Sequence, residues 1–292
     1  MDFDLAQLRA LNAAVSEGTF EAAARSLRVT PSAVSQRLKA LETAAGRVLL
    51  VRSKPIRVTE SGAVVLRMAR QVELLVADTA VELGDERSPR ATLPLAVNAD
   101  SLATWVLPAL APLAGSIGFD LHREDEDHTS ELLREGSVMA AVTTQARPVP
   151  GCRSVRLGVM RYRPMASPEF VARWFPAGLT PAALAVAPVL VFDRNDDIQH
   201  RYLRRRTGRS LDPPVHHVPA SSDFRSAIEL GFGWGMLPDL QSRTPERDGT
   251  VVDLDTDGAI DVVLHWQQWQ LRSGLLDRVA EAVVAAAREE LR

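Results

Sequence analysis

The sequence predicts a protein of the α/β class, in which an all-α N-terminal region and one long helix precede alternating strands and helices. Three observations predict it. Residues 19–42 have the pattern of two short helices joined by a tight turn. Residues 60–85 keep apolar residues three or four positions apart over several turns, as a single long helix does. From residue 91 onward, strand-like runs alternate with helical runs, which indicates a parallel sheet.

Length and composition indicate a soluble globular protein of two or three domains. The 292 residues exceed one typical domain, and 46% hydrophobic with 24% charged residues is ordinary. The single cysteine, Cys152, cannot form an internal disulfide; a small buried or inert residue is favoured over a redox sensor. The N-terminal stretch is acidic and amphipathic, unlike a signal peptide, and the apolar runs are too short to span a membrane. We therefore expect a cytoplasmic protein without a membrane partner.

Caps and apolar spacing place the N-terminal helices. A first helix is expected over 4–17, where Gly18 ends it and Thr19 caps the next helix. In the third helix Thr30 is the N-cap and Pro31 the first residue, because Pro lacks only an N–H that would be unpaired there. The apolar stripe of the second helix consists of Phe20, Ala23, Ala24 and Leu27, and that of the third of Ala33 or Val34, Leu38 and Leu41.

The third helix carries polar side chains on the face opposite its apolar stripe. Short hydroxyl and amide groups suit the edges of bases, and flanking cations suit phosphates. Such a helix after a tight turn is how a helix-turn-helix reads the major groove of DNA. The alternative is a small amphipathic hairpin of helices with one solvated face. The DNA-binding candidates on this helix are Thr30, Pro31, Ser32, Ser35, Gln36, Arg37 and Lys39.

Positive charge is concentrated in the same region. Between residues 25 and 57, eight cations stand against one acid, Glu42, which gives a local charge of +7 in a chain of net charge −3. A short hairpin expected over 51–59 adds two DNA-binding candidates, Arg52 and Lys54. A basic island in a slightly acidic protein indicates a polyanion that touches this part of the chain alone.

A long helix is predicted from Thr59 to about Asp85, followed by a hinge over Gly84–Arg90. Its apolar stripe must be buried against something, and a second copy of the chain is the economical partner, as in a coiled coil. Packing of the stripe on its own domain is the alternative. The stripe consists of Val65, Leu66, Ala69, Val72, Leu75, Val76, Thr79 and Leu83.

The sequence from residue 91 onward predicts strands that alternate with helices. Strands are expected over 92–97, 119–124, 139–144, 153–166, 189–193, 233–238 and 265–269. Helices are expected over 102–113, 130–135, 201–206, 222–230 and 275–291, with another capped by Ser167. The five arginines at positions 201, 204, 205, 206 and 209 are interpreted as a solvated face or a subunit contact rather than as a second DNA contact.

Two consecutive segments carry a resemblance to a known family. FEAAARSLRVTPSAVSQRLKALE and GRVLLVRSKPIRVTESG resemble the winged helix-turn-helix of the LysR-type transcriptional regulators. The remainder is most similar to the ArgP/LysG branch, in the segments VNADSLATWVLPAL, EDEDHTSELLREGSVMAAVTT, PVPGCRSVRLGVMRY and GFGWGMLPDL. One departure is Leu50, where the family usually has Phe, and we expect this change to affect packing of the wing more than DNA contact.

The resemblance implies a domain plan. A winged helix-turn-helix domain over 1–59 is followed by a linker and dimerisation helix with its hinge over 60–90. An α/β effector domain of two lobes, like that of periplasmic binding proteins, covers 91–292. Lobe I is expected at about 91–160 and 265–292, and lobe II at about 161–264.

The resemblance also implies a function and its partners. It implies a sequence-specific regulator that binds operator DNA, responds to lysine or arginine and controls a gene for export of basic amino acids. The implied assembly is a homodimer or homotetramer, with RNA polymerase as a further partner. The alternative is a DNA-architectural or replication-origin-binding protein without effector control.

An effector site is expected between the lobes, beyond the carboxyl ends of strands. A hydroxyl at the start of a helix and the two threonines that end the third strand suit an amino-acid carboxylate. Acids at neighbouring strand ends suit a cationic group, although the run over 124–127 is also explained as a solvated loop, and Trp105 also as a core residue. The candidates are Asp100, Ser101, Trp105, Glu124, Asp125, Asp127, Thr143, Thr144, Asp193 and Arg194.

Patterns of catalysis are not found in the sequence. The six histidines are scattered, no metal-ligand spacing occurs, and Cys152 has no neighbouring base in the sequence. The run GFGWG is followed by Met-Leu-Pro rather than by a helix start, so it is not a phosphate-binding loop. We expect no enzyme activity, no metal and no cofactor.

Overall fold

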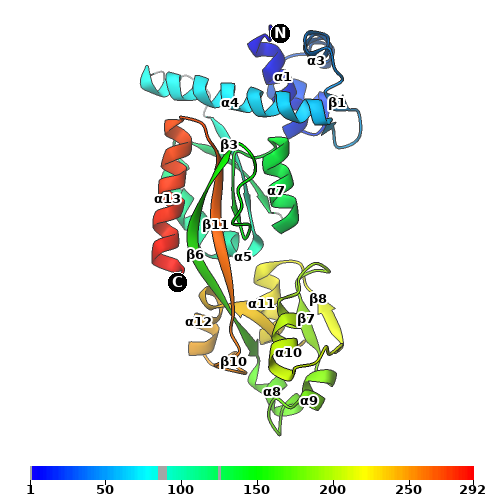
Figure 1. The fold of residues 1–292 in the computed structure, drawn as a ribbon, viewed down its shortest axis with the longest axis vertical. Helices are drawn as coiled ribbons and strands as arrows, with labels where there is room; N and C mark the ends of the chain where they lie inside the picture. Colours follow the sequence, from blue (N-terminus) through cyan, green and yellow to red (C-terminus); the bar gives the residue numbers. More distant parts are fainter. Residues whose placement is uncertain (1, 85–90, 124–125) are drawn as a thin grey trace. The chain divides into compact units, whose positions relative to one another are not determined.

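A computed structural model describes residues 2–84, 91–123 and 126–292 of the chain (Figure 1). It contains two compact units. The first comprises Met1–Val97, Ala111–Val155 and Trp266–Ala282, and the second comprises Asn98–Leu110, Arg156–His265 and Val283–Arg292. Three elements have residues in both units: strands β6 (Cys152–Ala166) and β11 (Ile260–Trp269) and helix α13 (Gly274–Glu290).

Three short helices open the first unit, as predicted. They are α1 (Leu5–Ser16), α2 (Phe20–Ser26) and α3 (Pro31–Ala45). The side chains of Asp4, Thr19 and Thr30 accept N–H groups in the first turns of these helices, which satisfies donors that a helix start leaves unpaired. Gly46 ends α3 at φ 65°, a left-handed conformation that glycine adopts without strain.

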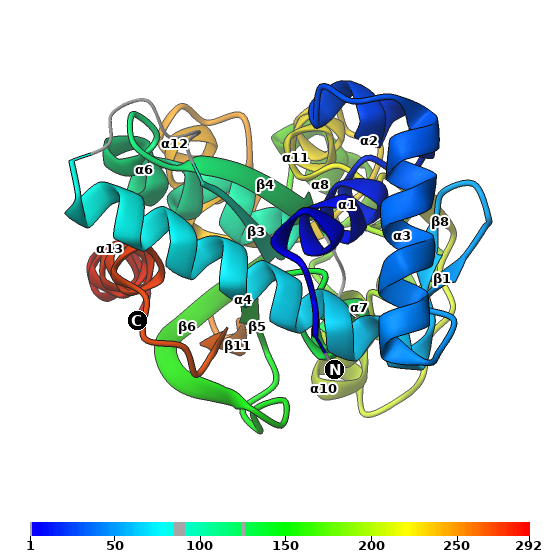
Figure 2. The same cartoon turned by 90° about the horizontal axis from the view of Figure 1, so that it is seen from above.

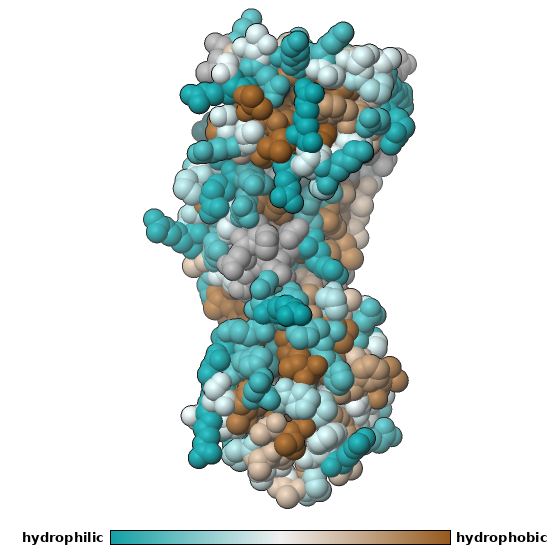
Figure 3. Space-filling view, turned by 90° about the vertical axis from the view of Figure 1, so that its right-hand side faces the viewer, coloured by the Kyte–Doolittle hydropathy of each residue, from teal (hydrophilic) through white to brown (hydrophobic). Residues whose placement is uncertain are grey.

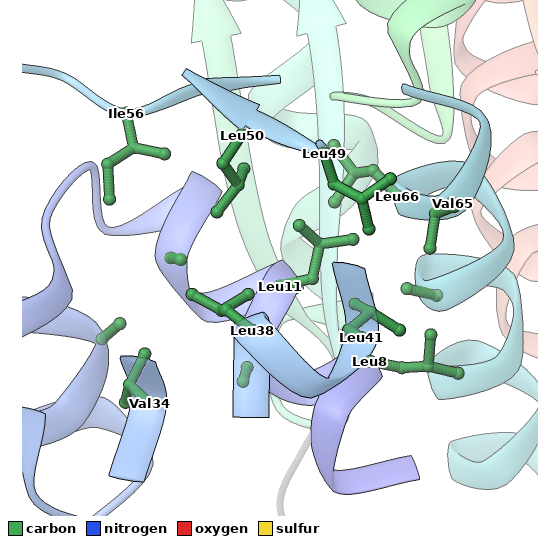
Figure 4. Packing of buried hydrophobic residues seen from close by; sticks show 14 of the residues in the cluster. Leu8, Leu11, Val34, Leu38, Leu41, Leu49, Leu50, Ile56, Val65 and Leu66 are labelled. Carbon is green, nitrogen blue, oxygen red and sulfur yellow. The ribbon is translucent and has the colours of Figure 1, made fainter. Parts of the chain in front are cut away.

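A small hairpin follows, made of β1 (Leu50–Val51) and β2 (Arg57–Val58), which pair antiparallel. Glu42 fastens it to α3, because its Oε1 accepts the N–H of Leu49 at 2.9 Å. Leu50, the residue that departs from the family pattern, is buried in the apolar core of this region. Figure 4 shows Leu8 and Leu11, Leu38 and Leu41, and Leu49 and Leu66 gathered from α1, α3, the hairpin and α4.

Helix α4 (Glu60–Glu82) is the long helix that the sequence predicts, and it lies across α1 (Figure 2). Its first half buries Val65, Leu66 and Ala69 in the N-terminal core. Its second half and its C-cap leave apolar side chains exposed, including Leu75 at 41% and the C-cap Leu83 at 79%. The predicted stripe therefore divides into a part that packs on its own domain and a part open to solvent. The expected hinge from residue 85 to 90 lies outside the described residues.

Polar contacts dock α4 on the later part of the first unit. Arg70 donates to the carbonyl of Ser137 and to Ser16 Oγ, and burial lowers the pKa of its guanidinium to about 10. Arg67 donates to the carbonyl of Arg134 at 3.0 Å. Asp78 accepts the N–H of Leu275 at 2.9 Å, in the first turn of α13 (Gly274–Glu290).

Three parallel strands lie next to one another in a seven-stranded sheet. β3 (Thr92–Val97) lies between β4 (Gly118–Arg123) and β5 (Ala140–Thr143), and Val97 is in register with both Arg123 and Val142. The predicted parallel sheet is confirmed for these strands, and their carboxyl ends share one edge. Helix α7 (Glu126–Glu135) begins four residues before the predicted helix.

The helical segment after β3 belongs to the second unit and departs from prediction. It begins at Ala99 rather than Leu102, and a turn of π-helix occupies its middle. Its parts are α5 (Ala99–Ser101), the π-helix Leu102–Val106, α6 (Leu107–Leu110) and the 3₁₀ turn Ala111–Leu113, the last of which lies in the first unit.

The rest of the second unit surrounds an antiparallel sheet. β6 (Cys152–Ala166) pairs with β9 (Gly235–Pro238) and with β10 (Val252–Asp253). Two further strands, β7 (Val189–Val191) and β8 (Val215–His217), pair parallel, and β11 covers Ile260–Trp269. The helices are α8 (Pro168–Trp174), α9 (Pro181–Val186), α10 (Ile198–Thr207), α11 (Ser221–Glu229) and α12 (Asp239–Arg247). The sequence did not predict α9, α12, β8 or β10.

The face shown in Figure 3 is largely hydrophilic, with separate hydrophobic patches. Within the described part of the chain, no helix is both long and apolar enough to cross a membrane.

Candidate DNA-binding and effector sites

The predicted DNA-binding side chains lie on the outer face of α3 and on the turn of the hairpin. Val34, Leu38 and Leu41 are buried, so the opposite face of α3 is turned away from the core. Ser35 and Arg37 are half-buried. The exposed candidates are Thr30, Pro31, Ser32, Gln36, Lys39, Arg52 and Lys54.

Two contacts set the geometry of this face. Thr30 Oγ1 accepts the N–H of Ala33 at 3.2 Å and lies 2.9 Å from Ser32 Oγ, which fixes the first turn of α3. The Arg52 guanidinium lies over the ring of Phe20, 5.8 Å from its centre, which holds a hairpin cation beside the start of α2. Hydroxyls, an amide and cations are thereby presented together, as DNA contact requires.

Arg28 is a residue of this region that sequence reasoning used only for its charge. It adopts φ 54° in the turn between α2 and α3, where a helix-turn-helix often has glycine. Its exposed side chain adds a cation at the turn itself.

The second unit surrounds Asp100 with hydrogen-bond donors. Its Oδ2 accepts the hydroxyl of Tyr162 at 2.7 Å. Its Oδ1 accepts the hydroxyl of Ser221 at 2.5 Å and, at 3.4 Å, an N–H of Gln241. Tyr162, Ser221 and Gln241 are all buried, and each comes from a different element: β6, α11 and α12.

The charge on Asp100 is not balanced by a cation. In the described ranges no lysine or arginine forms an ion pair with this carboxylate. Burial raises the pKa of Asp100, hydrogen bonds from Ser221 and Tyr162 lower it, and the nearby charge of Asp196 raises it. A cation bound beside Asp100 would lower this pKa, because an opposite charge favours the ionised carboxylate.

Polar atoms beside Asp100 are buried without a partner among the described residues. They are Asn98 Oδ1, Ser101 Oγ and Trp105 Nε1. Ser101 is fully buried and Trp105 is 2% exposed. They lie along the segment that contains the π-helix, and π-helical turns occur frequently at functional sites. Buried polar groups normally have partners, so these atoms indicate a ligand or bound water.

The remaining candidates are placed as follows. Asp193 Oδ1 accepts the N–H groups of Asn195 and Asp196 and so shapes its own turn, from which the exposed Arg194 projects. In the first unit, Thr143 is buried and its Oγ1 accepts the N–H of Gln145 at 3.2 Å, whereas Thr144 is half-buried.

Part of the predicted acidic cluster lies outside what the structure describes. Glu124 and Asp125 are outside the described residues, and Asp127 is described only as a position on α7. Among the residues that the structure does describe, no group of three or more histidines, cysteines or acids could hold a metal ion.

Sequence reasoning missed Tyr162, Ser221 and Gln241. Ser221 lies one residue before the predicted start of α11, and Gln241 lies on a helix that was not predicted. Nothing local in the sequence links these three residues to Asp100, because they are 62 to 141 positions away.

Comparison with known proteins accounts for both parts of the chain. The model of the bacterial regulatory helix-turn-helix protein, lysR family, matches residues 5–63, and that of the LysR substrate binding domain matches residues 86–292. A lysine export transcriptional regulatory protein, LysG of Corynebacterium efficiens, is 46% identical over 281 residues, which is 95% of this chain and 96% of the relative.

Solved structures give the same result over the full length. The crystal structure of ArgP from Mycobacterium tuberculosis has a TM-score of 0.85 at 44% identity and covers 100% of this chain and 99% of its own. Full-length LysG from Corynebacterium glutamicum with the effector Arg bound has a TM-score of 0.75 at 41% identity, covering 99% and 100%. These matches confirm the winged helix-turn-helix, the C-terminal effector-domain fold and the resemblance to ArgP and LysG. This chain belongs to the LysR family of bacterial helix-turn-helix transcriptional regulators.

Proposed function

We propose that this LysR-family regulator responds to a basic amino acid, lysine or arginine, and controls a gene for export of basic amino acids. The observation that carries an amino-acid effector is Asp100, a carboxylate surrounded by neutral donors with no cation to balance it among the described residues, which suits an ammonium group. The relative with bound arginine and the relative named for lysine export support the same effector class. RNA polymerase is proposed as a further partner.

A melting-shift screen of the full-length protein against the twenty amino acids tests the effector class. A ligand at about 100 times its Kd adds about 2.7 kcal/mol of stability, which is readily detected. We expect a shift with lysine or arginine. Identical binding of DNA with and without every amino acid would favour an architectural protein without effector control.

We further propose that the effector's carboxylate is bound by Ser101 and Thr144 and its side-chain cation by acids, Asp127 and Asp193 among them. Ser101→Ala should weaken binding of every amino acid, since it removes the shared anchor. Asp193→Asn should weaken cationic ligands alone, because Asn keeps the oxygen that accepts the N–H groups of the turn and loses only the charge. Asp127→Asn should act in the same way. Calorimetry with lysine, arginine, leucine and glutamate measures both effects; equal affinity for leucine and lysine would contradict the basic effector.

The exposed face of α3 is proposed to read bases, and the hairpin to contact phosphates. Gln36→Ala or Arg37→Ala should cost about 1–3 kcal/mol on the operator and much less on random DNA, as loss of a direct base contact does. Lys54→Ala should instead weaken both DNAs equally and reduce the salt slope by about one unit. Titrations of operator and random DNA at several salt concentrations separate these results. Equal effects of all three substitutions on both DNAs would contradict the assignment of base reading to α3 and of phosphate contact to the hairpin.

The open half of α4 is proposed to pair with the same helix of a second copy, which gives a homodimer and, through further contacts, a homotetramer. Its exposed apolar residues support this, since an unpartnered apolar stripe on a long helix is stable when a second helix covers it. The domain boundaries proposed from the sequence, at 59/60 and 90/91, place α4 between a DNA-binding and an effector-binding part.

A further inference from the structure

We propose that Asp100 binds the α-ammonium group of the effector, and that Tyr162, Ser221 and Gln241 are the residues that position it. This inference rests on the proposed function, since it assigns one end of an amino-acid ligand to one carboxylate. It concerns only contacts inside the second unit.

Hydrogen-bond donors hold both oxygens of the Asp100 carboxylate. Gln241 Nε2 donates to Ser221 Oγ, and the Ser221 hydroxyl then donates to Asp100 Oδ1. Tyr162 approaches the other oxygen, Oδ2. The carboxylate is therefore held from both sides by side chains of β6, α11 and α12, and its orientation is fixed before any ligand arrives.

Hydrogen-bond acceptors remain available on Asp100 and on two side chains near it. The Gln241 amide turns its N–H toward Ser221 and Asp100, which leaves Oε1 as a buried acceptor without a partner among the described residues. Ser101 Oγ lies one residue along the chain from Asp100 and is also buried and unpartnered. A carboxylate with free lone pairs, an amide oxygen and a hydroxyl are three acceptors, and an ammonium group has three N–H donors.

Lysine and arginine each carry two cations, the α-ammonium group and the side-chain group, and only one of them can reach Asp100. The α-ammonium and the α-carboxylate are attached to the same carbon, so the residues that bind them must be neighbours. Ser101, the proposed carboxylate anchor, directly follows Asp100, and its hydroxyl can donate to the carboxylate while it accepts an N–H of the ammonium group. The side-chain cation of lysine or arginine is several bonds further away and has to be met by other acids. The α-ammonium group is therefore the cation that reaches Asp100.

The negative charge of Asp100 favours a cationic ligand group. Asp100 has no ion-pair partner among the described lysines and arginines, and Asp196 adds negative charge nearby. A carboxylate that is largely removed from water, as the half-buried Asp100 is, is costly unless it is paired with a positive charge. The ligand supplies that charge, so the cost in the free protein is offset when the effector binds.

Matched ligands that differ only in the α-amino group test the inference. Lysine is compared with 6-aminohexanoic acid, and arginine with 5-guanidinopentanoic acid, by calorimetry on the full-length protein. We expect the wild type to bind each amino acid about 10- to 100-fold more tightly than its partner, the range for a hydrogen bond to a charged group. In Asp100→Asn and Tyr162→Phe this ratio should fall to near one, because the affinity for the amino acid falls and that for its partner does not.

Tyr202→Phe is the control, since the Tyr202 hydroxyl also contacts a carboxylate, that of Asp255 at 3.1 Å. Its ligand ratio should stay at the wild-type value. The inference is overturned if both ligands of a pair weaken equally in Tyr162→Phe, or if the wild type binds both equally well. Wild-type protein that binds neither lysine nor arginine would instead overturn the proposed effector class, and the inference with it. Tyr162→Phe loses only a hydroxyl, so it decides the question even if Asp100→Asn fails to fold.

Discussion

Leu75→Glu is expected to lower affinity for an operator with two half-sites by about 10²- to 10⁴-fold, which is the gain that linkage of two binding modules provides. Leu75 is 41% exposed on α4, beside Val76 at 38%, while the opposite side of the helix is buried. A charge placed in a helix–helix seam would have to be desolvated, so the pair of helices should separate. Sedimentation of the variant should show a monomer.

The readout separates assembly from DNA contact. Affinity for a single half-site should be nearly unchanged, because α3 and the hairpin are not altered. Val186→Glu is the matched control, since Val186 is an apolar residue at the end of α9 that is 55% exposed. It should leave both the dimer and the operator affinity intact. An unchanged dimer in Leu75→Glu would contradict the proposed role of α4.

Local signals in the sequence were sufficient for most of the fold. Thr19, Thr30 and Ser167 each cap a helix as predicted, because a cap is an interaction between residues three positions apart. Alternation of strands and helices predicted that β3, β4 and β5 run parallel. The reason is similarly local, since each crossover is made by the helix between two strands. The π-helical turn at Leu102–Val106 was not predicted, since no such local signal marks it in the sequence.

The two sites differ in how many of their residues could be predicted from the sequence. The DNA-binding face lies on one helix, so the spacing of Val34, Leu38 and Leu41 is enough to tell which side of α3 is exposed. The surroundings of Asp100 are assembled from β6, α11 and α12, and no local pattern marks their members. Asp100 itself was predicted, because it lies three residues beyond a predicted strand end; Tyr162, Ser221 and Gln241 were not.

Gly62→Ala is expected to destabilise the N-terminal core by about 2–3 kcal/mol, and with it the placement of the hairpin on α3. A Cβ at position 62 would lie 1.9 Å from the carbonyl oxygen of Leu49, far inside contact distance. That oxygen accepts the N–H of Thr59 at 2.9 Å, so the clash would also break a backbone hydrogen bond at the start of α4. Alanine is the better helix former by about 1 kcal/mol, which is too little to offset both costs. Calorimetric unfolding of the full-length protein measures the loss.

Gly115→Ala gives the matched control for this substitution. A Cβ at position 115 would meet no atom within 4 Å, and the residue does not adopt a left-handed backbone. Replacing it should be neutral or stabilise by up to about 1 kcal/mol, since the unfolded chain loses freedom. Because Gly62 lies where α4 meets the hairpin, its variant should also bind operator DNA more weakly, whereas the Gly115 variant should bind normally. A Gly62→Ala protein as stable as the wild type would mean that α4 and the hairpin can move apart at little cost, and that their close packing does not set the position of the hairpin cations.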